Sequence, residues 1–475
     1  MPASKNKYDS KNLREIMEEN NTDYVDLRFT DPRGKLQHVT QHIDTIDNIG
    51  IEDRVMFDAS SISGWKHVNE SDMILMPDVS TCTLDPFYAK PTLVVLCDVY
   101  DAVTEKPYSR CPRSIAKKAE AYLKSSGIGD DAFFASEVEF FIFDKVRFST
   151  TSTNSFFFLD SKESPSSSGI DYVEGNMGHR PRTKGGYFPV NPIDSAQDLR
   201  TEMLTVAKQL GICVEKHHHE AAVAQHELGI KYDTMLRSAD NTQQLKYIIH
   251  NLCDAYGKTA TFMPKPLFDD NGSGMHVHQS IWKAGKPLFA GDVYSGLSET
   301  ALHYIGGIMK HTPALNAITN PSINSYKRLV PGYEAPVLLA YSARNRSAAL
   351  RIPYAKSPRA KRVEVRFPDP LANPYLAFAA MMMAGLDGIE NKIDPGEPSH
   401  SNLYELSAEE QRKIPTVCSS LNEAIRALIA DSEFLLKGDV FTKDFLDSYI
   451  ELLRADWDRY KKIPHPVEFD MYYSG

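Results

Sequence analysis

The sequence predicts an α+β protein with a small N-terminal unit, residues 1–107, and a larger unit, residues 108–475. Three observations support this division. The first hundred residues alternate polar and apolar side chains between turn residues, which is typical of short strands. Just after residue 108 the apolar spacing becomes helical, and helix-like and strand-like stretches then mix. A chain of 475 residues also exceeds the usual size of a single core.

The composition is that of a globular protein, with 42% hydrophobic and 24% charged residues. The net charge of −10 argues against a general nucleic-acid surface, because such surfaces carry a basic excess. The six cysteines form no C-x-x-C pair, so we expect no disulfide framework. Because the N-terminus is polar and no apolar run is long enough to span a bilayer, we expect a cytoplasmic protein without a membrane partner.

The N-terminal unit is predicted to contain a hairpin and a buried strand. Residues 24–29 alternate in polarity, residues 31–34 form a turn, and residues 36–39 return as a second strand. The continuous apolar run at 92–99 is typical of a buried strand. A short helix carrying Leu13, Ile16 and Met17 is expected before the hairpin.

The larger unit begins with a helix that starts at Pro112 and ends at Gly127. Candidate strands are 132–143, 274–281 and 362–367, and further helices are predicted to start at Ser195, Asp240 and Ser420. Ser420 and Glu423 have the spacing of a capping box. The Ser-rich stretch 149–168 is interpreted as a surface loop without an assigned function.

Familiar catalytic motifs are absent from the sequence. Gly257-Lys258-Thr259 lacks the upstream glycine of a phosphate-binding P-loop, and His219-Glu220 lacks the second histidine of a zinc protease. The chemistry must therefore be sought in individual charged residues within apolar segments.

Two acidic residues stand in one apolar strand. Glu137 and Glu139 are two residues apart, so they share a strand face. Burying two carboxylates without partners is costly, and a metal ion would remove that cost. The alternative is a solvated strand face, which the flanking aromatic residues disfavour.

Similar patterns recur later in the chain. His276 and His278 share a face beside the Gly-rich turn 271–274, and Glu364 shares a face with Arg366. Structural histidines and a structural ion pair are the alternatives. A further acidic and histidine-rich segment, 217–227, contains His217, His218, His219, Glu220 and Glu227, and could instead be a solvated loop.

Together these segments provide five carboxylates and at least one imidazole, which favours Mg²⁺ or Mn²⁺ over zinc or copper. Arginines gather after them, and their forked guanidinium groups suit carboxylates and phosphates. These arginines are Arg328, Arg344, Arg346, Arg351, Arg359, Arg362 and Arg366. Two metals beside arginines indicate phosphoryl transfer, although a solvated basic face remains the alternative.

Eight segments, in this order, resemble the class I, bacterial-type glutamine synthetase family, beta subdivision. They are FDASSISGW (57–65), SEVEFFIF (136–143), KGGYFPV (184–190), HHHE with QHE (217–227), NGSGMHVH (271–278), NSYKRLVPGYEAP (324–336), NRSAALRIP (345–353) and VEVRFPDP (363–370). The resemblance runs from about residue 10 to the C-terminus. It implies an N-terminal β-grasp-like domain, and a catalytic domain with a curved antiparallel sheet and flanking helices. The implied activity is ATP-dependent ligation of ammonia to glutamate through γ-glutamyl phosphate, giving glutamine.

The resemblance also implies the site residues. Two metal sites, for two or three Mg²⁺ or Mn²⁺ ions per subunit, match Glu139, Glu220 and Glu227, and Glu137, His276 and Glu364. Catalytic positions match Asp58, which takes a proton from ammonium, the flap residue Glu334, and Arg346. Substrate-binding positions match Asn271, Gly272, Arg328, Arg366 and Tyr187, and ATP-binding positions match Glu215, His278, Ser280, Trp282 and Arg351.

The implied assembly is a dodecamer of two stacked hexamers, in which one subunit's N-terminal domain completes its neighbour's active site. The apolar stripe of the helix near 445–460 is then expected to serve an interface as well as the core. Tyr404 matches a tyrosine modified by an adenylyltransferase, with an ordinary loop tyrosine as the alternative. Ala59 departs from the family's usual glycine and is expected to shift the Asp58 loop.

Two other functions remain open on the sequence. One is a γ-glutamyl ligase for a larger amine, which a small acidic ammonium pocket disfavours. The other is a non-catalytic relative, which the presence of all six implied metal ligands disfavours.

Overall fold

The structure is a computed structural model that describes residues 13–46, 55–66, 71–173 and 175–474. Its first part contains α1 (Leu13–Glu19), β1 (Tyr24–Thr30), β2 (Leu36–His42), β3 (Val55–Asp58), β4 (Asp72–Pro77), β5 (Thr83–Leu84) and β6 (Thr92–Asp101). The middle part contains α2 (Pro112–Ser125), β7 (Asp131–Phe143), β8 (Lys145–Thr150), β9 (Ser155–Asp160), α3 (Gln197–Gln209), β10 (Val214–His219), β11 (Gln225–Ile230), β12 (Asp233–Thr234), α4 (Met235–Ala255), β13 (Thr259–Thr261) and β14 (Met275–Lys283).

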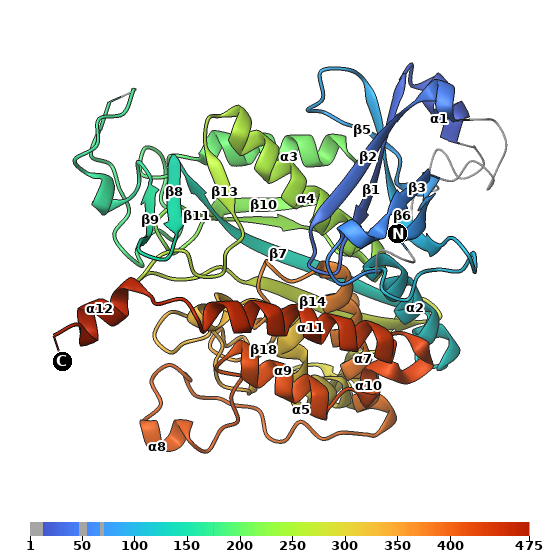
Figure 1. Ribbon diagram of the computed structural model, residues 1–475. Coiled ribbons are helices and arrows are strands. Elements are labelled where there is room, and N and C mark those ends of the chain that lie inside the picture. The colour runs from blue at the N-terminus through green and yellow to red at the C-terminus, as the bar shows by residue number, and fades with distance from the viewer. Residues whose placement is uncertain (1–12, 47–54, 67–70, 174, 475) are drawn as a thin grey trace.

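The last part of the chain is mainly helical. It contains β15 (Lys286–Pro287), β16 (Ala290–Tyr294), α5 (Glu299–Thr319), α6 (Ser325–Arg328), β17 (Tyr341–Ala343), β18 (Leu350–Ile352), β19 (Val363–Val365), α7 (Pro374–Glu390), α8 (Ala408–Gln411), α9 (Leu421–Ala430), α10 (Glu433–Leu436), α11 (Lys443–Tyr460) and α12 (Pro466–Tyr472). In Figure 1, β7 and β14 cross the middle of the molecule, the blue N-terminal strands lie at the upper right, and α12 projects at the lower left.

The N-terminal strands form a mixed sheet in the order β2-β1-β6-β4-β3, with β5 also paired to β6. Strand β1 pairs antiparallel with β2 and parallel with β6, so Leu27 lies between Val39 and Val95. The predicted hairpin and buried strand are thereby confirmed. The inward side chains of this sheet form a core separate from that of the larger sheet.

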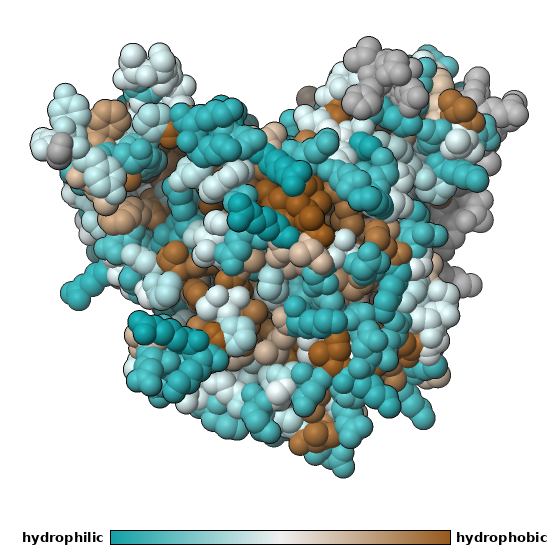
Figure 2. Space-filling model, turned by 60° about the horizontal axis from the view of Figure 1, so that its bottom comes forward, coloured by the Kyte–Doolittle hydropathy of each residue, from teal (hydrophilic) through white to brown (hydrophobic). Residues whose placement is uncertain are grey.

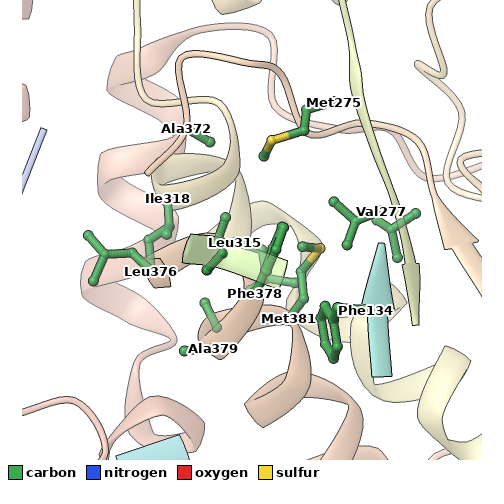
Figure 3. Packing of buried hydrophobic residues seen from close by; sticks show 14 of the residues in the cluster. Phe134, Met275, Val277, Leu315, Ile318, Ala372, Leu376, Phe378, Ala379 and Met381 are labelled. Carbon is green, nitrogen blue, oxygen red and sulfur yellow. The ribbon is translucent and has the colours of Figure 1, made fainter. Parts of the chain in front are cut away.

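The larger sheet has the order β10-β11-β7-β14-β19-β18-β17, and its neighbours are antiparallel except for β17 and β18. One of its faces packs on helices. Figure 3 shows Phe134 of β7 and Val277 of β14 directed toward side chains of α5 and α7, and the rings of Phe134 and Phe378 lie 5.4 Å apart. Because strand side chains alternate, the odd-numbered residues near Phe134 and the even-numbered residues near Val277 face away from these helices.

The surface of the molecule is hollowed between two lobes. Figure 2 shows a face notched at its top between two lobes, with hydrophobic side chains gathered near the floor of the notch among mostly hydrophilic ones. Within the described ranges, no helix has the length and apolar character required to cross a membrane. All six cysteines are free, and only Cys213 is exposed.

Several helix boundaries follow local sequence signals. Helix α2 begins at Pro112, and Gly127 just beyond its end has a φ of +72°, as predicted. Ser420 caps α9 by accepting a hydrogen bond from the N–H of Glu423. The predicted capping box is only half formed, because the Glu423 carboxylate accepts instead from the backbone and side chain of Ser419.

Two predicted helix starts are wrong. Helix α3 begins at Gln197 rather than Ser195, whose hydroxyl donates to Glu163 at 2.7 Å instead of capping the helix. Helix α4 begins at Met235, and Asp240 lies inside it. The Asp240 carboxylate accepts two hydrogen bonds from buried Arg113, so tertiary pairing, not capping, explains this acidic residue.

The Ser-rich stretch is not a simple surface loop. Strands β8 and β9 pair as a hairpin with Phe148 opposite Phe157. Beyond the hairpin, Glu163 is buried and contacts His219 of β10, the edge strand of the larger sheet. Earlier in the chain, residues 102–111 connect β6 to α2, and the unit boundary at 107/108 within them stays a prediction.

Candidate active site

A cleft of about 2440 Å³ lies over the face of the larger sheet that is turned away from α5 and α7. All but one of the predicted site residues line it. They are Glu137, Glu139, Tyr187, Glu215, Glu220, Glu227, Asn271, Gly272, His276, His278, Ser280, Trp282, Arg328, Glu334, Arg346, Arg351, Glu364, Arg366 and Tyr404. The exception is Asp58, on the N-terminal sheet.

Strand register brings the charged residues together. Glu137 of β7 lies opposite His276 of β14, and His278 lies opposite Glu364 of β19. On the other edge of β7, Glu139 lies opposite Glu227 of β11. Since paired residues share a face, these side chains point into the same cleft.

The first cluster consists of Glu137, His276 and Glu364, as expected. Their potential ligand atoms lie within 4.8 Å of one another, and Nδ1 of His276 is 3.6 Å from Glu137. Burial alone raises the pKa of Glu364, but the charges of Arg366, His278 and His276 together outweigh it and lower that pKa to about 2. Two carboxylates and one imidazole form a donor set suited to Mg²⁺ or Mn²⁺.

The second cluster differs from the expected one. It joins Glu220 and Glu227 to His218, whose ring nitrogens lie 3.3 Å and 3.2 Å from the two carboxylates. His218 was not assigned from the sequence, although it lies opposite Glu227 in the register of β10 and β11. The sequence signal that could have identified His218 was its position between His217 and His219.

Glu139 lies between the two clusters rather than within the second. Its carboxylate accepts hydrogen bonds from the N–H of Gly274 at 2.8 Å and from Gln225 at 3.1 Å. It also lies 3.7 Å from Nε2 of His276. Burial raises the pKa of Glu139, and burial together with the charges of Glu139 and Glu227 raises that of Glu220 well above its usual value. This crowding of carboxylates fits a site that receives cations.

Arginines complete the charge balance of the cleft. Glu364 accepts from Arg351 at 2.6 Å and also pairs with Arg366. Thus the structural ion pair considered for this segment exists, and its carboxylate also belongs to the first cluster. Arg346 lies 3.5 Å from the hydroxyl of Tyr187, while Arg328 donates to backbone carbonyls, including Phe367 at 2.8 Å.

The glycine turn approaches its neighbours closely. A β-carbon on Gly272 would lie 2.4 Å from the carbonyl oxygen of Pro264, so no larger residue fits there. Trp282, at the other end of β14, donates its indole N–H to Ser280 at 2.9 Å. The guanidinium of Arg359 lies 4.8 Å from the centre of the Trp282 ring.

The loop that carries Glu334 is clamped by its neighbour Tyr333. Two ammonium groups contact the ring of Tyr333, with Lys184 at 4.1 Å and Lys265 at 3.8 Å from its centre. Its hydroxyl donates to Asp269 at 3.0 Å. Glu334 itself has a φ of 56°, a sparsely populated conformation for a residue with a side chain.

Asp58 is exposed and does not reach the cleft of its own chain. Its carboxylate caps a short 3₁₀ turn by accepting from the N–H and hydroxyl of Ser60 at 2.8 and 2.6 Å, and these bonds lower its pKa. The methyl of Ala59 is buried in the N-terminal core. Tyr404 is 40% exposed at the rim of the cleft, where its hydroxyl donates to the carbonyl of Arg346 at 3.4 Å.

Acidic clusters beside arginines, on the open face of a curved sheet, are typical of metal-dependent enzymes that transfer phosphoryl groups. The comparisons agree with this class. A family model described as "Glutamine synthetase, catalytic domain" matches residues 109–472, and one described as "Glutamine synthetase, beta-Grasp domain" matches residues 21–102. The chain therefore belongs to the glutamine synthetase family.

Individual relatives cover nearly the whole chain. A glutamine synthetase of Azospirillum brasilense is 63% identical over 97% of this chain and 98% of its own. A protein of Cupriavidus pinatubonensis named 3-hydroxylaminophenol mutase is 57% identical over 97% of this chain and 98% of its own. Among solved structures, the glutamine synthetase of Plasmodium falciparum has a TM-score of 0.88 at 31% identity, covering 97% of this chain and 98% of that one.

Proposed function

We propose that this chain joins ammonia to the side-chain carboxylate of glutamate, with ATP as the energy source and glutamine, ADP and phosphate as products. The observation that carries the proposal is the meeting of two acidic clusters and several arginines in one cleft. Since one relative of comparable identity is named for a different reaction, the proposal depends on these residues more than on overall identity.

Divalent ions, Mg²⁺ or Mn²⁺ and two or three per subunit, fit the two clusters. Glu137, His276 and Glu364 would hold one ion near the nucleotide phosphates, where His278, Ser280, Trp282, Glu215 and Arg351 line the cleft. Glu220 and Glu227, with Glu139 and His218 beside them, would hold another near glutamate. When bound, the ions supply positive charge that stabilises the transferring phosphoryl group.

The arginines would act on the reacting groups. Asn271, Gly272, Arg328 and Arg366 would bind glutamate, and Arg346 would stabilise charge on the phosphoryl group. The glutamate carboxylate attacks the terminal phosphorus of ATP, and ADP leaves. Ammonia then attacks the acyl carbon, and phosphate leaves. Glu334 and its loop would close over the acyl phosphate, because water would otherwise hydrolyse it.

Ammonium must lose a proton before it attacks, and Asp58 is the proposed base, with Tyr187 near the same pocket. Asp58 is exposed and lies outside its own chain's cleft, which favours delivery into the cleft of a neighbouring subunit. Its lowered pKa keeps it an anion, as attraction of ammonium requires.

Exposed apolar faces support a homo-oligomer, for which we propose two stacked hexamers. Most of the stripe on α11 packs within its own chain, since Phe445, Tyr449 and Leu453 are buried, while Tyr460 at its end is 39% exposed. Helix α12 and the β8–β9 hairpin are different: Phe469 is 58% and Phe157 56% exposed. We therefore propose that these two elements contribute to the interface together with the exposed end of the α11 stripe.

Tyr404 is proposed as a site for an adenylyltransferase. Its exposed ring at the cleft rim is accessible, and an added nucleotide would lie beside Arg346. We also retain a cytoplasmic location, without a nucleic-acid or membrane partner, as part of the proposal.

The function is tested by phosphate release from ATP and Mg²⁺ with glutamate and either ammonium or putrescine. Release that needs ammonium and disappears in Glu364→Ala supports the proposal. Release only with putrescine would assign the chain to ligases of larger amines. If folded protein with metal bound releases no phosphate with either ammonium or putrescine, the result would favour a non-catalytic relative.

A further inference from the structure

One lysine reaches both acidic clusters from the edge of the sheet. Lys216 of β10, Gly229 of β11, Glu137 of β7 and His276 of β14 occupy one row of the strand register. The ammonium of Lys216 lies 3.6 Å from Glu137 and 3.5 Å from Glu227. It therefore contacts one carboxylate of each cluster.

Gly229 makes this reach feasible. A β-carbon at Gly229 would lie 3.1 Å from Cγ and 3.2 Å from Cε of Lys216, closer than ordinary contacts. The lysine stem thus lies across the one position in the row that has no side chain. The φ angle of Gly229 is not in the left-handed region. Glycine therefore matters at this position because it leaves space for the lysine side chain, not because of its backbone flexibility.

An ammonium group has three donors and no lone pair, so it is not a metal ligand. Its charge repels divalent cations, and it neutralises carboxylates when those cations are absent. Because the Lys216 side chain is 47% exposed, salt screens part of this effect.

We propose that Lys216 is a tethered counter-ion which bridges the two acidic clusters and weakens their binding of divalent cations. The inference rests on the proposed metal sites and assigns a role to a residue outside them. Entry of an ion displaces the ammonium from Glu137 or Glu227. Lys216 therefore sets the metal concentration at which the cleft fills, and it stabilises the metal-free protein.

The test is titration of Mn²⁺ into the full chain after metal removal with a chelator, with free Mn²⁺ measured by its paramagnetic resonance signal. We expect Lys216→Met to lower the Kd by about tenfold at low salt, and by less at higher salt. The matched control is Lys231→Met, which removes a lysine lining the same cleft; among the described residues, the lysine paired with the clusters is Lys216, not Lys231. That control should change the Kd less than about twofold.

Gly229→Ala provides a second variant that keeps the charge. Its methyl should displace the lysine stem and also tighten Mn²⁺ binding, and adding it to Lys216→Met should cause little further change. The metal-free Lys216→Met protein should melt below the original chain, while saturating Mn²⁺ should remove that difference and show that the variant folds.

Two results would overturn the inference. If the original chain binds Mn²⁺ and Lys216→Met leaves the Kd unchanged or raises it, only the role of Lys216 fails. If the original chain does not bind Mn²⁺ at all, the metal sites of the proposed function fail with it.

Discussion

The carboxylate of Glu163 accepts a hydrogen bond from Nε2 of His219 at 2.8 Å, which joins the Ser-rich segment to strand β10. Both side chains are buried. On the other side of the ring, Nδ1 of His219 lies 2.7 Å from the carbonyl oxygens of Gly186 and Glu220. The pair thereby connects the main chain beside Tyr187 to the main chain of Glu220 in the second cluster.

Loss of Glu163 should consequently affect both stability and metal binding. Glu163→Ala removes the carboxylate partner of the buried His219 and should lower the free energy of unfolding by about 3–5 kcal/mol. Glu163→Gln keeps the shape and should destabilise less, yet still weaken Mn²⁺ binding several-fold. Thermal unfolding and Mn²⁺ titration measure these effects. Unchanged metal affinity in a destabilised Glu163→Gln protein would show that the pair supports only the fold.

The contacts of Tyr333 should limit the amount of phosphate that is released when ammonium is absent. Tyr333→Leu removes both cation–π contacts and the bond to Asp269, so the Glu334 loop should open and admit water. We expect phosphate release without ammonium to rise by several-fold. Tyr333→Phe retains the ring and is the matched control, for which a smaller rise is expected. Equal behaviour of the two variants would contradict a role for the cation–π contacts.

Lys265 should make the contacts of Tyr333 sensitive to pH. Burial lowers the pKa of Lys265 from 10.5 to about 8. Because the folded-state pKa is lowered, the ammonium that contacts Tyr333 is present below about pH 8 and is lost as the pH rises through that value. Phosphate release without ammonium should therefore increase across this range.

Lys265→Arg keeps its charge over the same range, so its release without ammonium should stay nearly flat. Equal slopes for Lys265→Arg and the original chain would exclude Lys265 as the origin of the pH dependence.

A shared active site makes a prediction about mixed oligomers. Asp58→Ala and Glu364→Ala should each be inactive, since one removes the proposed base and the other a proposed metal ligand. If Asp58 acts in a neighbour's cleft, co-expressed subunits of the two kinds should regain part of the activity, because some interfaces contain both intact residues. Pure oligomers of each variant are the controls. Mixed oligomers as inactive as the controls would place Asp58 elsewhere in the mechanism.

Much of the site could be predicted because strand alternation is local. Residues two apart on a strand share a face, which places Glu137 with Glu139 and His276 with His278. The curved antiparallel sheet then brings the two strands into register. Pro112 likewise predicted the start of α2, since proline fits the first helical turn without a backbone donor.

The remaining features depend on distant partners. Asp240 resembled a helix start until its pairing with Arg113 became visible, and Ser195 donates to Glu163 instead of capping. His218 was not assigned from the sequence, and it lies beside Glu220 and Glu227 because the pairing of β10 and β11 places it opposite Glu227. The metal site expected from Glu139, Glu220 and Glu227 stays a prediction. Asp58 does not line the cleft of its own chain, so its proposed role in a neighbouring subunit's cleft depends on an assembly that a single chain does not display.

The most direct test of the account follows the nitrogen atom. Purified protein is incubated with glutamate, ATP, Mg²⁺ and ¹⁵N-labelled ammonium, and the product is examined by nuclear magnetic resonance. The account predicts label in the side-chain amide of glutamine, one per ATP consumed, and none with Glu364→Ala. ATP consumption without labelled glutamine, by folded protein with metal bound, would contradict it.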